Sequence, residues 1–443
     1  MKFLVNIIRI LVGALFIFSG FVKAIDPLGT SYKMHEYFEA FSPLGLSAFW
    51  EWMNSLSTPF AVFMIVIEMA AGIALLTGWK PKFTVWILFL MTLFFTVLTG
   101  FTYLSGFCPT IPFALHSIAI IVLLMVSAAK FNSPGGKKVF WITLILTISF
   151  LGMLKTSGYF HCEFTETKMK VTDCGCFGDF MKLKPWQTFY KDIVLDVLIF
   201  ILVIGVGYIK PIVKRSTNNF IVYGGTLASL LFCFSNYIWG LPIVDFRPYK
   251  IGNNIREQRQ MLKPEVRKMV FIYKNTKTNE TKNFTTEELG DLSDDWDFID
   301  RKDSIIDPGI PAKINNLYIS NEDGENVTDT LLADPNYSFM VVIYRMAEVN
   351  KNAITEKLNP LAVQCEKAGI KFYAVCGGDM KVDDFRHELN TPFPFYTADE
   401  TPLKTIIRSN PGLVLLKDGV VIDMWHHKHL PDFEELNGKY FKK

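Results

Sequence analysis

Apolar positions are concentrated in the first part of this chain, where long hydrophobic runs are separated by short polar connections. A helix needs roughly 20 apolar residues to cross a bilayer core of about 30 Å. The pattern predicts an α-helical polytopic membrane bundle over residues 1–241, with seven spans at Phe3–Val22, Pro59–Gly78, Phe83–Leu104, Phe107–Ala129, Val139–Leu154, Phe189–Ile209 and Phe220–Leu241. The first run is too long for a cleaved signal peptide and no small-residue cleavage site follows it, so we expect it to remain as a span.

Beyond residue 241 short apolar stretches alternate with polar turns. Residues 242–307 are predicted to be a linker and a short β-rich segment, because apolar and polar positions alternate there around Asn and Asp. Residues 308–443 alternate between strand and helix patterns, which predicts a soluble α/β domain. We expect strands at Asn316–Ile319, Phe339–Tyr344, Lys371–Cys376 and Val420–Trp425, and helices at Asn350–Ala368 and Val382–Leu389.

The connections between spans differ in charge from one side of the membrane to the other. Loops on one side hold basic residues and no acidic ones: Lys80, Lys82, Lys130, Lys137, Lys138, Lys210, Lys214 and Arg215. Loops on the other side, Lys23–Thr58 and Lys155–Thr188, include eight acidic residues, from Asp26 to Asp179. Basic loops stay in the cytoplasm. We therefore expect a bacterial inner-membrane protein with a cytoplasmic N-terminus and a periplasmic C-terminal domain.

Composition narrows the choice of partners. Of 443 residues, 50% are hydrophobic and 20% are charged, and the net charge is only +2. This balance predicts contact with membrane lipid and gives no basic surface for nucleic acid. No pattern predicts an oligomeric state.

Two cysteines one residue apart, Cys174 and Cys176, stand in a short polar stretch between apolar runs. A Cys-x-Cys disulfide closes a small strained ring, and strained exposed disulfides are the labile, catalytic kind. Gly175 between them removes a Cβ where the turn is tightest. The alternative is a structural turn with two unpaired thiols. On the periplasmic face disulfides persist, so the position favours redox chemistry.

Two more of the seven cysteines, Cys108 and Cys162, are predicted on the same membrane face. Four thiols allow three pairings, and we favour Cys174 with Cys176 and Cys108 with Cys162. The second pair is either a structural disulfide or a second redox pair. Cys233 is expected to be buried in the last span. In the soluble domain, we expect Cys365 to pack against the sheet, and Cys376 is either a buried strand-end residue or a lone reactive thiol.

Ionisable residues within the spans are costly and each suggests a role. Glu68 lies near the middle of the second span and Arg9 two turns into the first, so the two can form a charge pair that holds adjacent helices together. Asp192 and Asp196 share one face of the sixth span. The alternative is a proton relay from thiol oxidation through Glu68 or Asp196.

Several of these segments together resemble the DoxX and MauE group of redox-associated membrane proteins. They are Arg9–Lys23, Glu68–Gly78, Cys174–Gly178 and the pair Pro185-Trp186. The resemblance covers residues 1 to about 210 and implies a four-helix membrane core that takes part in disulfide formation on exported proteins. Here an extra hairpin, within an insertion of about residues 107–170, brings in Cys108 and Cys162. Two thiol pairs would resemble membrane oxidases that use a quinone as electron acceptor, although no quinone site can be read from the sequence.

The order of elements in residues 308–443 looks like the thioredoxin fold. Pro411 matches the position that is commonly a cis-proline beside the active site of that fold. The redox motif should follow the strand that ends at Tyr344, but Arg345–Asn350 contains no cysteine. The resemblance therefore implies a degenerate module that binds a partner or an extended peptide at Pro411.

These patterns favour a membrane thiol-disulfide oxidoreductase or maturation factor whose Cys174 and Cys176 exchange electrons with an exported client protein. Lysines at 170, 182 and 184 would lower the pKa of its thiols, whereas Asp173 and Asp179 would oppose this. One alternative is a non-enzymatic membrane scaffold. Another is a metal site formed by His161, Cys162, Cys174 and Cys176. The histidines at 426, 427 and 429 are expected to form a surface cluster rather than a metal site.

Overall fold

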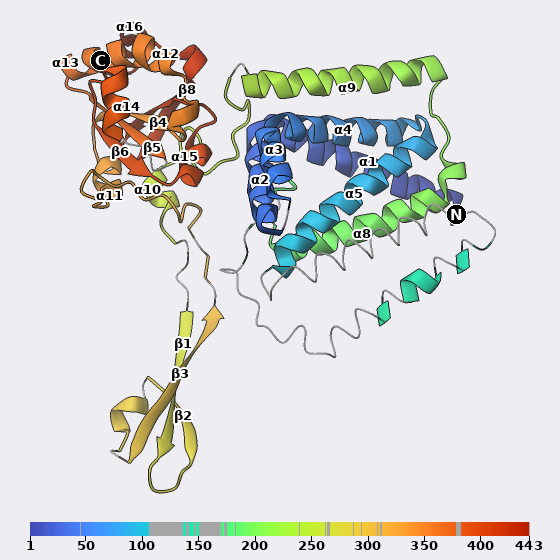
Figure 1. Ribbon diagram of the computed structural model, residues 1–443, viewed down its shortest axis with the longest axis horizontal. Coiled ribbons are helices and arrows are strands. Elements are labelled where there is room, and N and C mark those ends of the chain that lie inside the picture. The colour runs from blue at the N-terminus through green and yellow to red at the C-terminus, as the bar shows by residue number, and fades with distance from the viewer. Residues whose placement is uncertain are drawn as a thin grey trace. The chain divides into compact units, whose positions relative to one another are not determined.

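The computed structural model describes residues 1–443 except 45, 106–134, 136, 139–140, 146–147, 150–168, 170, 172–174, 182, 239, 262, 264–265, 287, 294, 308, 311, 378–381 and 443. The chain divides into two compact units, Met1–Phe246 and Arg247–Lys443. We call them the helical unit and the α/β unit (Figure 1). The boundary lies close to the change in hydrophobic pattern near residue 241.

The helical unit contains several long helices (Figure 1). Its described α-helices are α1 (Lys2–Ile25), α2 (Pro27–Phe41), α3 (Ser47–Ser55), α4 (Ser57–Thr77), α5 (Pro81–Leu104), α8 (Pro185–Ile204) and α9 (Arg215–Ile238). Single-turn 3₁₀ segments follow α2 at Ser42–Leu44 and α8 at Val206–Tyr208. The expected spans at Phe107–Ala129 and, for the most part, Val139–Leu154 lie outside the described residues.

Among the described helices, α1, α4 and residues Pro81–Tyr103 of α5 are long and apolar enough to cross a membrane. Helices α8 and α9 cover the sixth and seventh predicted spans but are not among these three candidates. In α8 the reason is visible in the sequence, because Lys191, Asp192 and Asp196 follow one another within two turns.

Local signals in the sequence set the helix ends. Asp26 separates α1 from α2 and its side chain accepts a hydrogen bond from the Gly29 backbone N–H, at 3.0 Å. Pro27 fills the first helical position, where no backbone donor is needed. Helix α4 ends at Gly78, whose φ of +73° is the left-handed conformation typical of a helix C-terminus.

Small residues let α1 and α4 approach closely. A Cβ atom on Gly72 of α4 would lie 2.9 Å from the Gly13 carbonyl oxygen of α1. The buried core around this contact includes Val5, Val12, Leu75, Leu88 and Ile199, from α1, α4, α5 and α8. Cys233 of α9 is fully buried against Ala24, Val62 and Ile65, as the sequence predicted.

The α/β unit contains two sheets (Figure 1). The smaller is antiparallel with order β2-β1-β3, formed by β1 (Val266–Asn275), β2 (Thr281–Thr285) and β3 (Trp296–Asp307). The larger has order β6-β5-β4-β7-β8, with β4 (Tyr337–Ile343), β5 (Lys371–Gly377), β6 (Phe395–Ala398), β7 (Gly412–Lys417) and β8 (Val420–His426). Strands β4, β5 and β6 are parallel, whereas β7 and β8 are antiparallel to their neighbours.

Helices cover the larger sheet. Its buried core includes Phe339, Val341, Ala374 and Leu415 from the strands and Leu361, Phe385 and Leu436 from α13 (Asn359–Lys367), α14 (Val382–Leu389) and α16 (Phe433–Leu436). The expected helix at 350–368 is present as α12 (Lys351–Ala353), a π-helical turn at Ile354–Leu358 and α13. Shorter helices are α10 (Ile255–Gln258), α11 (Thr328–Leu332) and α15 (Glu400–Ile406).

The strand expected at Asn316–Ile319 is not formed. This segment is irregular, and it meets the edge strand β6 only through a single bridge between Ser320 and Thr397. The apolar positions that suggested a strand, Leu317 and Ile319, are buried by packing rather than by a ladder.

Candidate functional site

Residues 175–181 lie against three helices of the helical unit. Ser19 of α1 donates a hydrogen bond to the Cys176 carbonyl oxygen, at 3.0 Å. Gly175 has a φ of +60°, and a Cβ there would lie only 3.1 Å from Lys33 Cγ of α2. Phe177 is buried, and the Lys191 ammonium of α8 lies 5.2 Å from the centre of its ring. The glycine between the cysteines is therefore required by both conformation and close packing.

Cys176 is a free thiol and is only partly exposed. Its sulfur interacts with the Lys191 ammonium. Lys191 is also paired with Asp192, at 2.9 Å, and the Thr99 hydroxyl of α5 donates to the other Asp192 oxygen at 3.0 Å. An ammonium group and a carboxylate thus meet beside the thiol.

The protonation of Cys176 reflects two opposing influences. Burial raises the pKa of this thiol, because a thiolate loses solvation there, and the Asp192 carboxylate acts in the same direction. The Lys191 ammonium, and more weakly Lys23, lower the pKa of the thiol. Burial dominates, so the free thiol is mainly protonated near neutral pH and Lys191 limits the increase.

A second ion pair, buried on both sides, lies near the same thiol. Lys23 in the last turn of α1 contacts Glu68 in the middle of α4 at 2.7 Å, and both side chains are about 95% buried, with exposed fractions of 6% and 5%. The Lys23 ammonium also lies 4.8 Å from the centre of the Phe95 ring of α5. This corrects the expected pair between Arg9 and Glu68.

Arg9 has different partners. Its guanidinium donates hydrogen bonds to the carbonyl oxygens of Leu75 (2.8 Å), Leu76 (2.6 Å) and Lys210 (2.9 Å). The first two are unpaired carbonyls at the C-terminal end of α4, where a cation is favoured. Arg9 is therefore a structural residue that joins α1, the end of α4 and the segment after α8.

Two small cavities adjoin Cys176. The first, of about 20 Å³, is lined by Lys23, Lys33, Tyr37, Glu68, Thr99 and Cys176, among others. The second, of about 30 Å³, is lined by Ser19, Lys23, Glu68, Cys176, Lys191 and Asp192, among others. Each has room for a water molecule and polar groups to bind it. Lys23, Glu68 and Cys176 line both.

Asp196 is one turn away from this cluster on α8. It accepts a hydrogen bond from the Thr96 hydroxyl of α5, at 2.7 Å, and lines neither cavity. The structure thus places Asp192, not Asp196, beside the thiol. Sequence reasoning missed Lys23 and Lys191, although both are lysines at or within apolar helices, where ionisable residues are rare.

Several predicted site residues lie outside the described residues, namely Cys108, His161, Cys162, Asp173 and Cys174, together with Lys170 and Lys182. The pairing of these cysteines and the four-residue metal site remain predictions. Over the described part of the chain, no cluster of three or more potential metal ligands is present.

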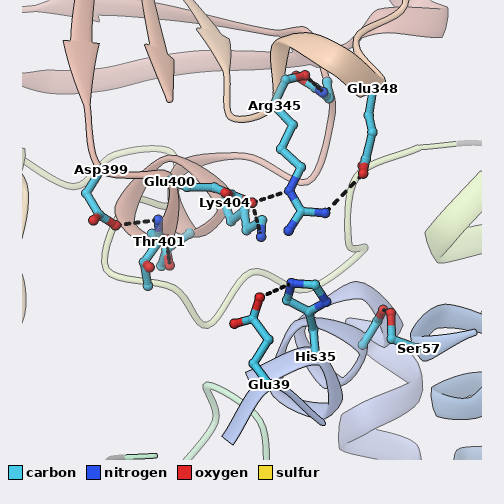
Figure 2. Close-up of polar contacts among 12 residues, drawn as sticks. His35, Glu39, Ser57, Arg345, Glu348, Asp399, Glu400, Thr401 and Lys404 are labelled. Carbon is cyan, nitrogen blue, oxygen red and sulfur yellow. Dashed lines mark hydrogen bonds and ion pairs between the residues drawn. The ribbon is translucent and has the colours of Figure 1, made fainter. Parts of the chain in front are cut away.

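In the α/β unit, the Asn410–Pro411 peptide bond is cis. The Asn410 side-chain amide donates to the Arg345 carbonyl oxygen at 2.7 Å. Arg345 follows β4 and pairs with Glu348 at 3.0 Å and with Glu400, which also pairs with Lys404 (Figure 2). An ion-pair cluster therefore occupies the position beside Pro411 where the sequence lacks the expected dithiol.

The two cysteines of the α/β unit, Cys365 and Cys376, are buried. The Cys376 thiol donates to the Tyr396 carbonyl oxygen at 3.3 Å, and burial raises the pKa of Cys376 to about 11. Burial raises the pKa of Cys365 to about 12. Both are thus protonated near neutral pH, which favours the interpretation of Cys376 as a structural residue.

The histidine cluster is only partly on the surface, which corrects the prediction. His426 is buried, with an exposed fraction of 6%, and its ring lies 4.1 Å from that of His427. Its Nδ1 accepts a hydrogen bond from the Lys428 N–H, while His427 contacts the Ser409 hydroxyl. These contacts are local and give no convergent metal geometry.

Apolar helices of membrane-spanning length, followed by an α/β unit, define a helical membrane protein with an appended domain. Residues 1–108 match the model of the family described as "Methylamine utilisation protein MauE", so the first part of the helical unit is similar to MauE membrane proteins. The match includes Lys23 and Glu68 but ends before Cys176 and Lys191. No curated protein and no solved structure matches this chain.

Proposed function

We propose that this protein is a membrane thiol-disulfide redox or maturation factor that acts on exported proteins through Cys174 and Cys176. The observation that carries the proposal is the position of the Cys176 thiol, which interacts with the Lys191 ammonium and adjoins the Lys191–Asp192 and Lys23–Glu68 ion pairs. Placing four charged groups in an apolar helical unit is costly, so a purely structural turn does not account for them. The MauE likeness supports a membrane accessory protein in a redox-related pathway.

The chemistry is thiol-disulfide exchange. A client thiolate attacks the Cys174–Cys176 disulfide, one loop sulfur leaves as a thiolate, and a mixed disulfide forms. A second client thiolate then breaks the mixed disulfide. The client loses two electrons and two protons, and the loop gains two thiols. Lys191 stabilises Cys176 when it leaves as a thiolate.

The reduced pair must then be oxidised again. A disulfide formed by Cys108 and Cys162 could accept the two electrons, and a quinone in the membrane could serve as the final acceptor. Cys108–Cys162 could equally be a structural disulfide. The cavities beside Cys176, of about 20 and 30 Å³, are too small for a quinone ring, so a quinone would bind elsewhere.

The proposed membrane topology follows from the charge pattern of the connections between spans. Seven spans would leave the N-terminus in the cytoplasm of a bacterial cell and place both the Cys-Gly-Cys loop and the α/β unit in the periplasm. Two basic residues support this orientation, Lys80 between α4 and α5 and Lys82 in the first turn of α5. It puts the thiols on the side where exported proteins form disulfides.

Thiol trapping in living cells tests the proposal. Cells are quenched with acid, free thiols are labelled with a mass-tagged maleimide, and the oxidation state of Cys176 is read by peptide mass spectrometry. We expect wild type to contain both states and to shift between them after dithiothreitol or diamide treatment. Cys174→Ser should abolish the cycle, whereas the matched control Cys376→Ser should preserve it. A Cys176 that stays in one state throughout would exclude the redox function.

A second candidate is a scaffold that binds a partner through the α/β unit. Two observations favour it. The strand order of the larger sheet supports a thioredoxin-like module, and the ion pairs of Arg345 with Glu348 and Glu400 stand where its redox motif would be. In that case Cys174→Ser and Cys176→Ser would leave the cellular phenotype unchanged, while deletion of residues 247–443 would abolish it. A metal site at residues 161–176 would instead show as bound metal that is lost in Cys176→Ser.

A further inference from the structure

The buried Lys23–Glu68 pair is unusual because it adjoins a nucleophile as well as connecting two helices. Both residues line both cavities beside Cys176. They come from α1 and α4, whereas Lys191 and Asp192 come from α8. A pair needed only to hold α1 against α4 would have no reason to lie at the thiol, since Gly13, Gly20 and Gly72 already bring these helices together.

The charges around Cys176 can be counted element by element. Helix α1 contributes Lys23, α2 contributes Lys33, α4 contributes Glu68, and α8 contributes Lys191 and Asp192. Lys33 is paired with Glu36 at 2.6 Å. The groups that α5 presents to the cavities, Thr92, Phe95, Leu98 and Thr99, are uncharged. Lys23 thus supplies a positive charge near the sulfur, and Glu68 is the nearest anion that offsets it.

We infer that Lys23 and Glu68 form a tuning pair for the Cys176 thiolate, in which Lys23 stabilises the thiolate and Glu68 sets how much of that stabilisation reaches the sulfur. Both act as positioning and electrostatic residues and neither exchanges electrons. In a site with little water, a neighbouring charge changes the ionisation of a thiol strongly.

The biological role of this pair rests on the proposed function, but its electrostatic effect does not. The ionisation of Cys176 can be measured on the purified protein whether or not the thiol cycles in cells. Electrostatics predicts opposite signs for the two single substitutions. Glu68→Gln leaves Lys23 uncompensated and should favour the thiolate. Lys23→Met leaves Glu68 uncompensated and should disfavour it. If the pair were only structural, both substitutions would change the ionisation of Cys176 in the same direction, or neither would change it.

The test uses the full chain in detergent micelles, with Cys174→Ser as background so that no disulfide can form within the loop. The rate of Cys176 alkylation by iodoacetamide is followed across a pH series by peptide mass spectrometry. Below the pKa of the thiol, we expect Glu68→Gln to react roughly tenfold faster than the background protein and Lys23→Met roughly tenfold slower. The double variant, which removes both charges, should lie between them, and Lys23→Arg should stay close to the background.

Asp196→Asn is the matched control, because it removes a carboxyl group from the same unit that lines neither cavity. It should leave the pH profile unchanged. If Lys23→Met fails to fold, as judged by size-exclusion chromatography, Glu68→Gln and the double variant still decide the question. Unchanged profiles in both, or slower reaction in Glu68→Gln, would overturn the inference. If Cys176 does not cycle in cells but the alkylation profiles of the purified variants are as predicted, only the proposed function is overturned.

Discussion

Lys191 and Asp192 show how neighbouring residues in one helix can have opposite effects on the same thiol. Lys191 lowers the pKa of Cys176 by charge and by direct interaction, and Asp192 raises it. The ion pair between them keeps both charged groups partnered inside an apolar helical unit. The sequence predicted lysine assistance for the thiol but assigned it to residues 170, 182 and 184, because those are closer in sequence. Helical periodicity, not sequence distance, brings Lys191 to the sulfur.

Removal of this ammonium should make Cys176 less reactive. In Lys191→Met, the pKa of Cys176 should rise further, because burial and Asp192 remain while the largest opposing influence is lost. The thiolate fraction at neutral pH, and with it the alkylation rate by iodoacetamide, should fall roughly tenfold or more. Lys191→Arg keeps the charge and should retain most of the rate. An equal or faster rate in Lys191→Met would contradict this assignment.

A buried histidine should make the α/β unit sensitive to acid. Burial, with help from the positive charges nearby, lowers the pKa of His426 to about 4. The unfolded chain binds a proton at this side chain below about pH 6.5, whereas the folded chain does not until near pH 4. The stabilisation is therefore complete above about pH 6.5 and is lost as pH falls toward 4, by on the order of 1–3 kcal/mol.

Hydrogen exchange of the β7 and β8 peptides, corrected for the intrinsic effect of pH, measures this loss. His426→Asn keeps an acceptor for the Lys428 N–H but does not titrate, so its protection should vary less between pH 7 and pH 4 than that of wild type. His387→Asn, at an exposed position of α14, is the control and should behave as wild type. Equal pH dependence in all three proteins would contradict the role given to His426.

At the level of elements, the antiparallel register of α1 and α4 explains which ionisable residues meet. Gly13 faces Gly72, Arg9 reaches Leu75 and Leu76, and Lys23 reaches Glu68. Arg9 precedes Lys23 by 14 residues, which is about 21 Å along a helix. Arg9 and Glu68 therefore lie at different heights and cannot pair. The sequence predicts that both positions lie within membrane spans, but the register of the two helices depends on glycine contacts that hydrophobic periodicity does not reveal.

The close contact between α1 and α4 predicts that a Gly→Ala substitution destabilises the protein at Gly72 but not at Gly224. Gly72→Ala would place a Cβ 2.9 Å from the Gly13 carbonyl oxygen and 3.0 Å from the Ile17 backbone nitrogen, so the helices must separate. We expect a loss of about 1–3 kcal/mol in stability. Gly224→Ala in α9 meets no atom within 4 Å and should be neutral or slightly stabilising. Thermal unfolding in detergent compares the two, and equal unfolding temperatures would argue against close packing of α1 on α4.

At the scale of the whole molecule, the hydrophobic pattern alone separated the membrane helices from the α/β unit, and its boundary near residue 241 lies close to the division after Phe246. Helices α5 and α8 begin at Pro81 and Pro185, a few residues before the starts predicted at Phe83 and Phe189. Two amphipathic helices, α2 and α3, were missed because they lie in a polar loop and depend on packing against α4 and α5. The edge segment before Ser320 was predicted as a strand, since burial of Leu317 and Ile319 resembles that of a strand.

Orientation in the membrane is the property of the whole chain that the charge pattern predicts most directly. Asp323 lies in an exposed turn of the α/β unit, and Lys82 is exposed at the start of α5. In cells with a permeabilised outer membrane, Asp323→Cys should react with a membrane-impermeant maleimide. Lys82→Cys should react only after the inner membrane is lysed, because basic connections remain in the cytoplasm. The reverse result would place the Cys176 thiol away from exported proteins and would make disulfide exchange with them impossible.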